Sequence, residues 1–255
     1  MTGTQRIAMR VRYDGTGFHG SQLQSGQRTV SGTLTTELSS LLKQDVHLLW
    51  AGRTDSGVHS DGNVCAFDAQ PAMPVDNLAV MLNDRLPEDL RVSAQWLAEP
   101  GFHPRFDALL RTYTYRIWRA ALAPVDRHRY VLEYPQPLDA GRLRRAAALF
   151  EGEHCFRAFC KQPEAGDACI CQLEPPVVEE HGAEITIVIR GNRFLRHMIC
   201  RLVGAMLAVC SGRLSEDDIT EALGAGGELS LNPAPARGLT LTWVDYEGQL
   251  RDGRN

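Results

Sequence analysis

The sequence contains very little lysine. Of its 27 basic residues only Lys43 and Lys161 are lysines, and the other 25 are arginines. Guanidinium groups bind phosphates through two hydrogen bonds and stack on bases, but codon bias in a GC-rich genome would produce the same excess. The net charge of -4 does not by itself indicate a nucleic-acid-binding protein.

Local clusters of arginine are more informative than the total, because they can form an electrostatic footprint within an acidic protein. The two clusters are Arg105, Arg111, Arg116 and Arg119, and Arg190, Arg193, Arg196 and Arg201.

Long apolar segments are also missing. No run of eighteen apolar residues occurs, which excludes a membrane-spanning helix, and residues 1–10 have no apolar core of the kind that a secretory signal needs. The apolar content of 44% and the charged content of 23% are ordinary for a globular protein. We therefore predict a soluble cytoplasmic protein with no membrane association.

Cysteine pairs with metal-binding spacing are absent as well. The seven cysteines include no Cys-x-x-Cys motif, and an odd number argues against a disulfide framework. A denser group could hold zinc, which leaves a zinc-binding interaction protein as one alternative. The group consists of His154, Cys155, Cys160, Cys169 and Cys171. Free thiols are the prediction.

Alternating and helical hydrophobic patterns predict a mixture of strands and helices. In the first part of the chain strands are expected at 6–13, 46–52, 63–68 and 92–98, with helices from Thr29 and around 78–82. In the second part strands are expected at 111–119, 185–189 and 239–243. Helices are expected from Asp139, over 195–210 and after the Ser215–Asp218 capping box. Residues 160–184 and 224–238 are predicted to be loops.

The two parts share a loose theme, in which an apolar strand is followed by a glycine, an aromatic residue and a helix. The theme runs from Val11 to Phe18 and again from Ile187 to Phe194. It predicts two pseudo-symmetric halves, residues 1–101 and 102–255, around one mostly antiparallel central sheet flanked by helices. The fold class is α+β, and a cleft between the halves would be the natural place for an active site.

The most unusual stretch is residues 51–59, Ala-Gly-Arg-Thr-Asp-Ser-Gly-Val-His. Gly52 and Gly57 allow tight backbone geometry on both sides of Asp55, so one carboxylate would be displayed at a strand end beside Arg53. On the pattern alone Asp55 is more typical of a turn former, because Asp-Ser-Gly is a common turn sequence.

This stretch resembles the Gly-Arg-Thr-Asp-Ala-Gly-Val-His signature of the tRNA pseudouridine synthase A family, with Ser56 in place of alanine. Further blocks resemble that family in the same order along nearly the whole chain. They are residues 13–16 (Tyr-Asp-Gly-Thr), 82–90, 102–106, 113–115, 194–204 and 234–239. Each block is modest, but their order makes the resemblance specific.

The resemblance implies an enzyme with the pseudouridine synthase fold that converts uridine to pseudouridine in the anticodon stem-loop of tRNA, at nucleotides 38, 39 and 40. It implies a homodimer, in which one tRNA contacts both subunits, and neither a cofactor nor a catalytic metal. By the same resemblance Asp55 is the catalytic aspartate, Tyr113 packs on the target base and Arg53 enters the space that the base leaves. Without it, Tyr113 would be read as a core tyrosine.

Two further positions depart from the family pattern. Ser21 stands where the family has a tryptophan, and Cys200 stands where it has an arginine that is thought to pair with the catalytic aspartate. We predict that Arg201, or else Arg196 one helical turn before Cys200, supplies the missing cation. The alternatives are a catalytically impaired tRNA-binding relative and a pseudouridine synthase with another tRNA target.

Overall fold

A computed structural model describes residues 3–161, 169–225 and 229–247. The chain divides into two compact units: unit 1 comprises residues 1–109 and 241–255, and unit 2 comprises residues 110–240. The bounds of these compact units do not test the predicted division into two halves, residues 1–101 and 102–255, which stays a prediction.

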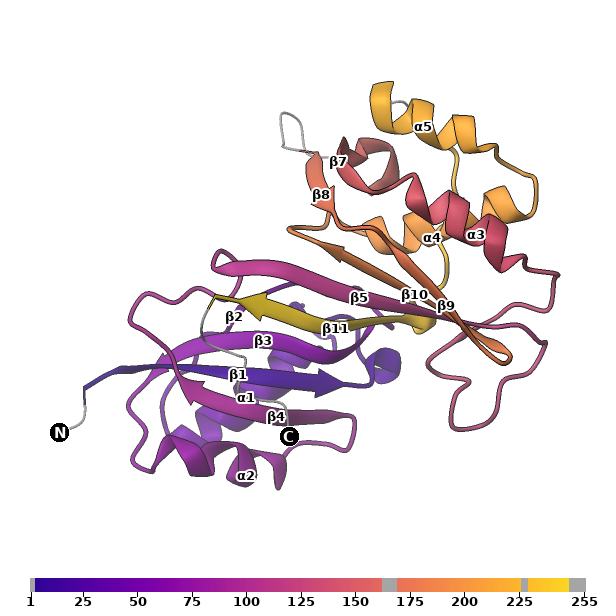
Figure 1. Cartoon of the computed structure of the whole chain (residues 1–255). Helices are drawn as coiled ribbons and strands as arrows, with labels where there is room; N and C mark the ends of the chain where they lie inside the picture. The colour runs from indigo at the N-terminus through magenta and orange to yellow at the C-terminus, as the bar shows by residue number, and fades with distance from the viewer. Residues whose placement is uncertain (1–2, 162–168, 226–228, 248–255) are drawn as a thin grey trace. The chain divides into compact units, whose positions relative to one another are not determined.

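Unit 1 is an antiparallel sheet covered by two helices (Figure 1). Its strands are β1 (Gln5–Tyr13), β2 (Leu49–Trp50), β3 (His59–Ala69), β4 (Leu90–Leu97) and β11 (Leu239–Tyr246), and its helices are α1 (Val30–Leu42) and α2 (Leu78–Asn83). The strand order is β4-β1-β3-β11, and β2 pairs with β3. Strand β11 comes from the C-terminal end of the chain and completes the sheet beside β3.

The core of unit 1 follows from the alternation in β1. Ile7, Met9 and Val11 point to one face, where they are fully buried against Leu34 of α1 and Leu78 of α2. Burial of such side chains contributes roughly 1.5–3 kcal/mol each. The sheet is thereby fixed on the helix layer, and the loops at its strand ends have a rigid support.

Unit 2 is also an antiparallel sheet with helices packed on it (Figure 1). Its strands are β5 (Ala108–Trp118), β6 (Leu132–Glu133), β7 (Gly152–Cys155), β8 (Ile170–Leu173), β9 (Val177–His181) and β10 (Glu184–Gly191). Its helices are α3 (Ala140–Ala148), α4 (Met198–Cys210) and α5 (Glu216–Ala225). The order is β5-β10-β8-β7, with β9 also paired to β10 and the short β6 parallel to β5.

Helix α4 is the central helix of unit 2. Nearly all of its residues are buried, as expected for a helix that is apolar around its whole circumference, and α3 packs on it. It begins at Met198 rather than at the predicted Leu195, because His197 has a left-handed backbone conformation (φ 59°) that interrupts the helical path. A non-glycine residue is uncommon in that conformation.

The α+β prediction with a mostly antiparallel sheet is confirmed. Besides the start of α4, two details were wrong. Residues 160–184 contain strands β8 and β9 instead of a loop only, and the strand predicted at 46–52 is reduced to Leu49–Trp50. Part of the predicted loops, residues 162–168 and 226–228, lies outside the described residues.

Candidate active site

Asp55 lies in the loop between β2 and β3 of unit 1, as predicted. Its side chain is partly exposed, Arg53 is exposed, and Thr54 between them is buried. The loop turns directly after Asp55, because the amide of Val58 donates to the Asp55 carbonyl (3.1 Å) and Gly57 has a positive φ of 79°. The carboxylate is therefore presented on a tight turn beside an exposed guanidinium.

The Asp55 loop is held by a buried hydrogen-bond network around Thr54. The Tyr13 hydroxyl lies 2.8 Å from Thr54 Oγ1. Asn63 Nδ2 donates to the Tyr13 hydroxyl (3.2 Å) and to the carbonyl oxygen of Gly52 (3.0 Å). Burial raises the pKa of the Tyr13 phenol, so the hydroxyl stays protonated and the network stays neutral.

A second contact fixes the end of the loop. The amide of Gly15 donates to Nδ1 of His59, which is buried at the start of β3 (3.1 Å). Gly15 packs so closely that a Cβ there would lie 2.1 Å from the carbonyl oxygen of Val58, so any larger residue would push the loop away. Residues 13–16 and the Asp55 loop thus meet in space, although more than forty residues separate them.

Tyr113 lies in unit 2, on strand β5. It is 8% exposed and its ring makes an edge-to-face contact with Phe194 at a centroid distance of 5.1 Å. It faces the same side of the sheet as Ile189, its partner on β10. Such edge-to-face pairs hold a ring in one orientation.

The two arginines proposed for the missing cation lie at the start of α4. Arg196 is exposed, and its carbonyl oxygen accepts from the amide of Lys161 (3.1 Å). Arg201 Nη2 donates to the carbonyl oxygens of Ala158 (3.3 Å) and Leu229 (3.4 Å). The guanidinium of Arg201 therefore contributes to the packing of unit 2, and its predicted pairing with Asp55 stays a prediction.

Cys200 is 6% exposed on α4. Its carbonyl oxygen accepts from the amide of Ala234 (2.8 Å). Burial, and to a lesser extent the nearby Cys200, raises the pKa of Tyr115 on β5, whose hydroxyl donates to Pro235 (2.8 Å). Position 200, where the family has an arginine, is thus buried near Tyr115 of β5.

Cysteine pairing departs from the prediction. Cys155 and Cys169 form a disulfide across the β7–β8 region, with Cα atoms 4.9 Å apart, so free thiols were wrongly predicted for these two. The other five cysteines, Cys65, Cys160, Cys171, Cys200 and Cys210, are not part of a disulfide. Spacing in the sequence did not reveal the pair, because it is created by the β7–β8 pairing that brings Cys155 opposite Ile170.

The described ranges offer no support for the zinc-binding alternative. Within them, no group of three or more histidine, cysteine, aspartate or glutamate side chains is placed to hold a metal ion. No helix in the same ranges has the length and apolar character needed to cross a membrane.

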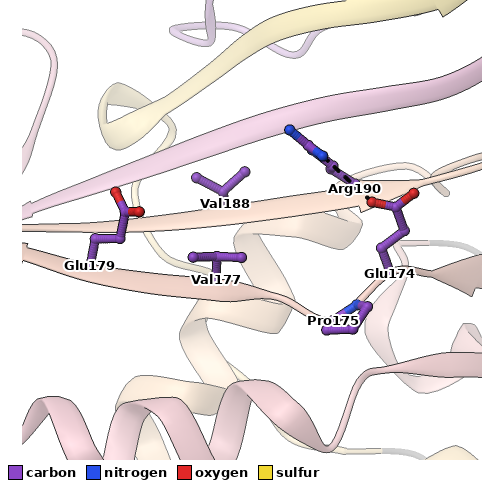
Figure 2. A pocket seen from close by; sticks show the side chains of 6 residues that line it. All are labelled: Glu174, Pro175, Val177, Glu179, Val188 and Arg190. Carbon is purple, nitrogen blue, oxygen red and sulfur yellow. Dashed lines mark ion pairs between the residues drawn. The ribbon is translucent and has the colours of Figure 1, made fainter.

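A hollow of about 220 Å³ lies on the β9–β10 hairpin of unit 2 (Figure 2). It contains an ion pair between Arg190 and Glu174 (3.7 Å). The lining residues are Glu174, Pro175, Val177, Glu179, Val188 and Arg190. None of the catalytic and substrate-binding residues predicted from the sequence lines it.

Sequence reasoning missed the residues that brace the site. Thr54, Tyr13, Asn63, Ser21 and His59 were not singled out for a role, although most of them lie inside or beside the motifs that led to Asp55. The sequence signal that could have found these residues is the presence of two motifs, residues 13–16 and 51–59. Each motif contains small residues that permit close approach of two backbone segments.

The Asp55 carboxylate lies on a turn beside an exposed arginine, and buried hydrogen bonds hold that turn in place, as the reacting group of an enzyme site requires. The sequence matches the family model of the tRNA pseudouridine synthases over residues 9–107 and 146–247. The chain therefore belongs to the tRNA pseudouridine synthase family, a family of isomerases.

Individual relatives agree with this assignment. The chain is 34% identical over 243 residues to tRNA pseudouridine synthase A of Brevibacillus brevis. The aligned region covers 95% of this chain and 100% of the relative. It is 36% identical over 248 residues to the protein of the same name from Bacillus pumilus, and the aligned region covers 95% of this chain and 99% of that relative. It is 37% identical over 247 residues to the tRNA pseudouridine synthase A of Frankia casuarinae, and the aligned region covers 96% of this chain and 90% of that relative.

Proposed function

We propose that this chain isomerises uridine to pseudouridine in the anticodon stem-loop of tRNA, at nucleotides 38, 39 and 40, with Asp55 as the catalytic carboxylate. The observation that carries the proposal is the placement of Asp55 on a braced turn beside Arg53 in a member of the tRNA pseudouridine synthase family. The proposed setting is the cytoplasm, and the proposed assembly is a homodimer that contacts one tRNA with both subunits.

The reaction needs no external reagent. The C1′–N1 bond of the nucleotide breaks, the uracil turns, and a C1′–C5 bond forms. A proton leaves C5 and a proton is taken up at N1, so substrate and product have the same composition. The partly exposed Asp55 carboxylate is suited either to attack the nucleotide covalently or to accept the C5 proton, and no cofactor is required for either path.

The target base must first leave its stack in the RNA, which costs a few kcal/mol. In the proposal the exposed Arg53 enters the space that the base vacates, and Tyr113 packs against the flipped base. The edge-to-face contact with Phe194 supports this role, because it holds the Tyr113 ring in a fixed orientation before the substrate arrives.

The proposal is tested with tRNA transcripts that carry tritium at C5 of uridine. The wild-type chain should release tritium, and sequencing of the product should place pseudouridine at nucleotides 38, 39 and 40. Pseudouridine at other nucleotides would show a synthase with another tRNA target.

Asp55→Asn should abolish tritium release while tRNA affinity stays nearly unchanged. The change keeps the side-chain shape, and binding rests mainly on phosphate contacts elsewhere. Asp68→Asn is the matched control, because it also removes one carboxylate of unit 1, from a surface ion pair with Arg6, and should leave the rate unchanged. Substantial turnover by a pure Asp55→Asn preparation would contradict the assignment of Asp55.

A second candidate function, a tRNA-binding protein with impaired catalysis, is favoured by one observation. Cys200 is a buried thiol where the family has an arginine, and Arg201 beside it donates to two backbone carbonyls. Such a protein would retard tRNA in a gel and release no tritium.

A further inference from the structure

Ser21 contacts both backbone polar groups of Thr54, the residue before Asp55. The amide of Ser21 donates to the carbonyl oxygen of Thr54 (3.0 Å), and the hydroxyl Oγ of Ser21 accepts from the amide of Thr54 (2.8 Å). Ser21 is 1% exposed, so water does not replace these contacts. The two peptide groups on either side of Thr54 are therefore fixed by a single residue.

Gly20 allows this close approach. It has a φ of +84°, and a Cβ at this position would lie 2.8 Å from the carbonyl oxygen of Thr54. A residue with a side chain would be strained by the backbone conformation and would also collide with the loop. The Gly20–Ser21 segment is thus shaped to run directly alongside Thr54.

The same segment is tied to helix α1. The carbonyl oxygen of Gly20 accepts from Val30 (3.2 Å), and that of Ser21 accepts from Ser31 (3.0 Å). Helix α1 is anchored in the core of unit 1 through the fully buried Leu34 and Leu38. A continuous set of contacts therefore runs from the packed helix through Ser21 to the loop that carries Asp55.

We propose that Ser21 is a positioning residue for Asp55: its hydroxyl holds the Thr54 amide and so sets the direction in which the next residue presents its carboxylate. This inference rests on the proposed role of Asp55. A small misplacement of a reacting group has a large effect on rate, on the order of 10²-fold for about 1 Å. Ser21 itself touches Thr54 and not the reacting atoms, so its loss should act on catalysis through Asp55.

The test compares Ser21→Ala with Ser39→Ala. Ser39 is a matched control, because its hydroxyl also accepts a hydrogen bond from a backbone amide, that of Val46 (3.1 Å), and it lies near the other end of α1. Each variant leaves one amide without its side-chain acceptor, and the free energy of unfolding is measured for both, with the larger loss expected for the more deeply buried Ser21.

Single-turnover rates, measured with enzyme in excess over tRNA, separate positioning from folding. We expect Ser21→Ala to slow the single-turnover step by ~10-fold to ~100-fold at unchanged tRNA affinity, and Ser39→Ala to keep the wild-type rate. Ser21→Cys keeps the approximate shape with a weaker acceptor and should give an intermediate rate. If Ser21→Ala does not fold, the single-turnover rate of Ser21→Cys tests the positioning role of Ser21.

The failure of this inference is distinguishable from failure of the proposed function. An inactive wild-type chain, or an active Asp55→Asn variant, would overturn the proposed function. If the wild-type chain is active and Asp55→Asn is not, a folded Ser21→Ala or Ser21→Cys variant that reacts as fast as Ser39→Ala overturns the positioning role of Ser21. A rate loss matched by an equal loss of tRNA affinity would also overturn it.

Discussion

At the scale of single residues, the exchange of arginine for cysteine at position 200 raises the question of which cation faces Asp55. The sequence favoured Arg201 because it is adjacent and long. In the structure Arg201 Nη2 donates to Ala158 and Leu229 within unit 2, so moving it toward a carboxylate would leave these carbonyl oxygens without that donor. A cation close to the Asp55 carboxylate would stabilise its negative charge in the proposed reaction.

We therefore expect Cys200→Arg to raise the single-turnover rate, and Arg201→Ala to act mainly on stability. Loss of the Arg201 hydrogen bonds should lower the free energy of unfolding by roughly 1–3 kcal/mol, measured by urea unfolding. Arg196→Ala, at an exposed position, is the comparison for the other candidate. A folded Arg201→Ala variant with no turnover would show instead that Arg201 supplies the cation.

At the scale of elements, long periodic segments could be predicted and short ones could not. The alternation in residues 6–13 gave strand β1, and Thr29 and Asp139 were confirmed as the N-caps of α1 and α3. Strands β8 and β9 were missed because each is short and Pro175 and Pro176 lie between them.

The candidate site also has a part that the sequence predicted and a part that it could not predict. The motif led to Asp55 and Arg53 because its residues are contiguous. The contacts that brace the loop join residues far apart in sequence, such as Ser21 with Thr54 and Tyr13 with Asn63. Periodicity and propensity report only on neighbours along the chain, so these contacts could not be read from one sequence.

The cap of helix α3 makes a prediction about pH. Asp139 Oδ1 accepts from the amide of Arg142 (3.0 Å), and the backbone amides of Arg142 and Gly141 lower the pKa of the Asp139 carboxyl. A lowered pKa in the folded state means that the carboxylate stabilises the fold at neutral pH, and that this contribution is lost as the pH falls through the folded pKa.

Asp139→Ala should therefore lower the melting temperature at neutral pH, and the difference from wild type should shrink as the pH falls below the ordinary range of an aspartate carboxyl and through the lowered folded-state pKa. Asp139→Asn keeps a capping oxygen and should retain more of the stability. Asp126→Ala is the control, because Asp126 is an exposed carboxylate of unit 2 whose only role among the described contacts is an ion pair with Arg127 (4.0 Å). Equal losses for Asp139→Ala and Asp126→Ala would contradict the cap.

The disulfide between Cys155 and Cys169 is the second element-scale feature that can be tested. It closes a loop with a sequence separation of 14, for which the chain-entropy model gives a stabilisation of about 3 kcal/mol. Replacing both residues by serine should lower the free energy of unfolding by up to that amount, and a dithiol reductant should destabilise the wild type but not the double variant. Cys210→Ser, which removes a free cysteine, is the control, and peptide mapping that finds both thiols free would refute the link.

At the scale of the whole molecule, the number of arginines overstates the charge available to a polyanion. Arg116 and Arg119 of the first arginine cluster pair with Glu184 (3.8 Å) and Glu180 (2.9 Å). Arg190 of the second cluster pairs with Glu174. The ion pairs reduce the positive potential that these side chains present, since a nearby carboxylate offsets each guanidinium. Arg53 and Arg196 are exposed, so their charge is available to a polyanion.

We expect tRNA affinity to fall with salt despite the net charge of -4, because each neutralised phosphate contributes a log–log slope of about -0.9 on duplex and about -0.7 on single strands. Arg53→Gln and Arg196→Gln should each reduce the slope by about one such contact. Arg119→Gln should change it less, because its guanidinium is already paired with Glu180. The measurement is filter binding of tRNA at a series of salt concentrations. A wild-type affinity that does not change with salt would rule out an electrostatic footprint. A wild-type slope for Arg53→Gln and Arg196→Gln would show that the exposed arginines are not the ones that contact phosphate.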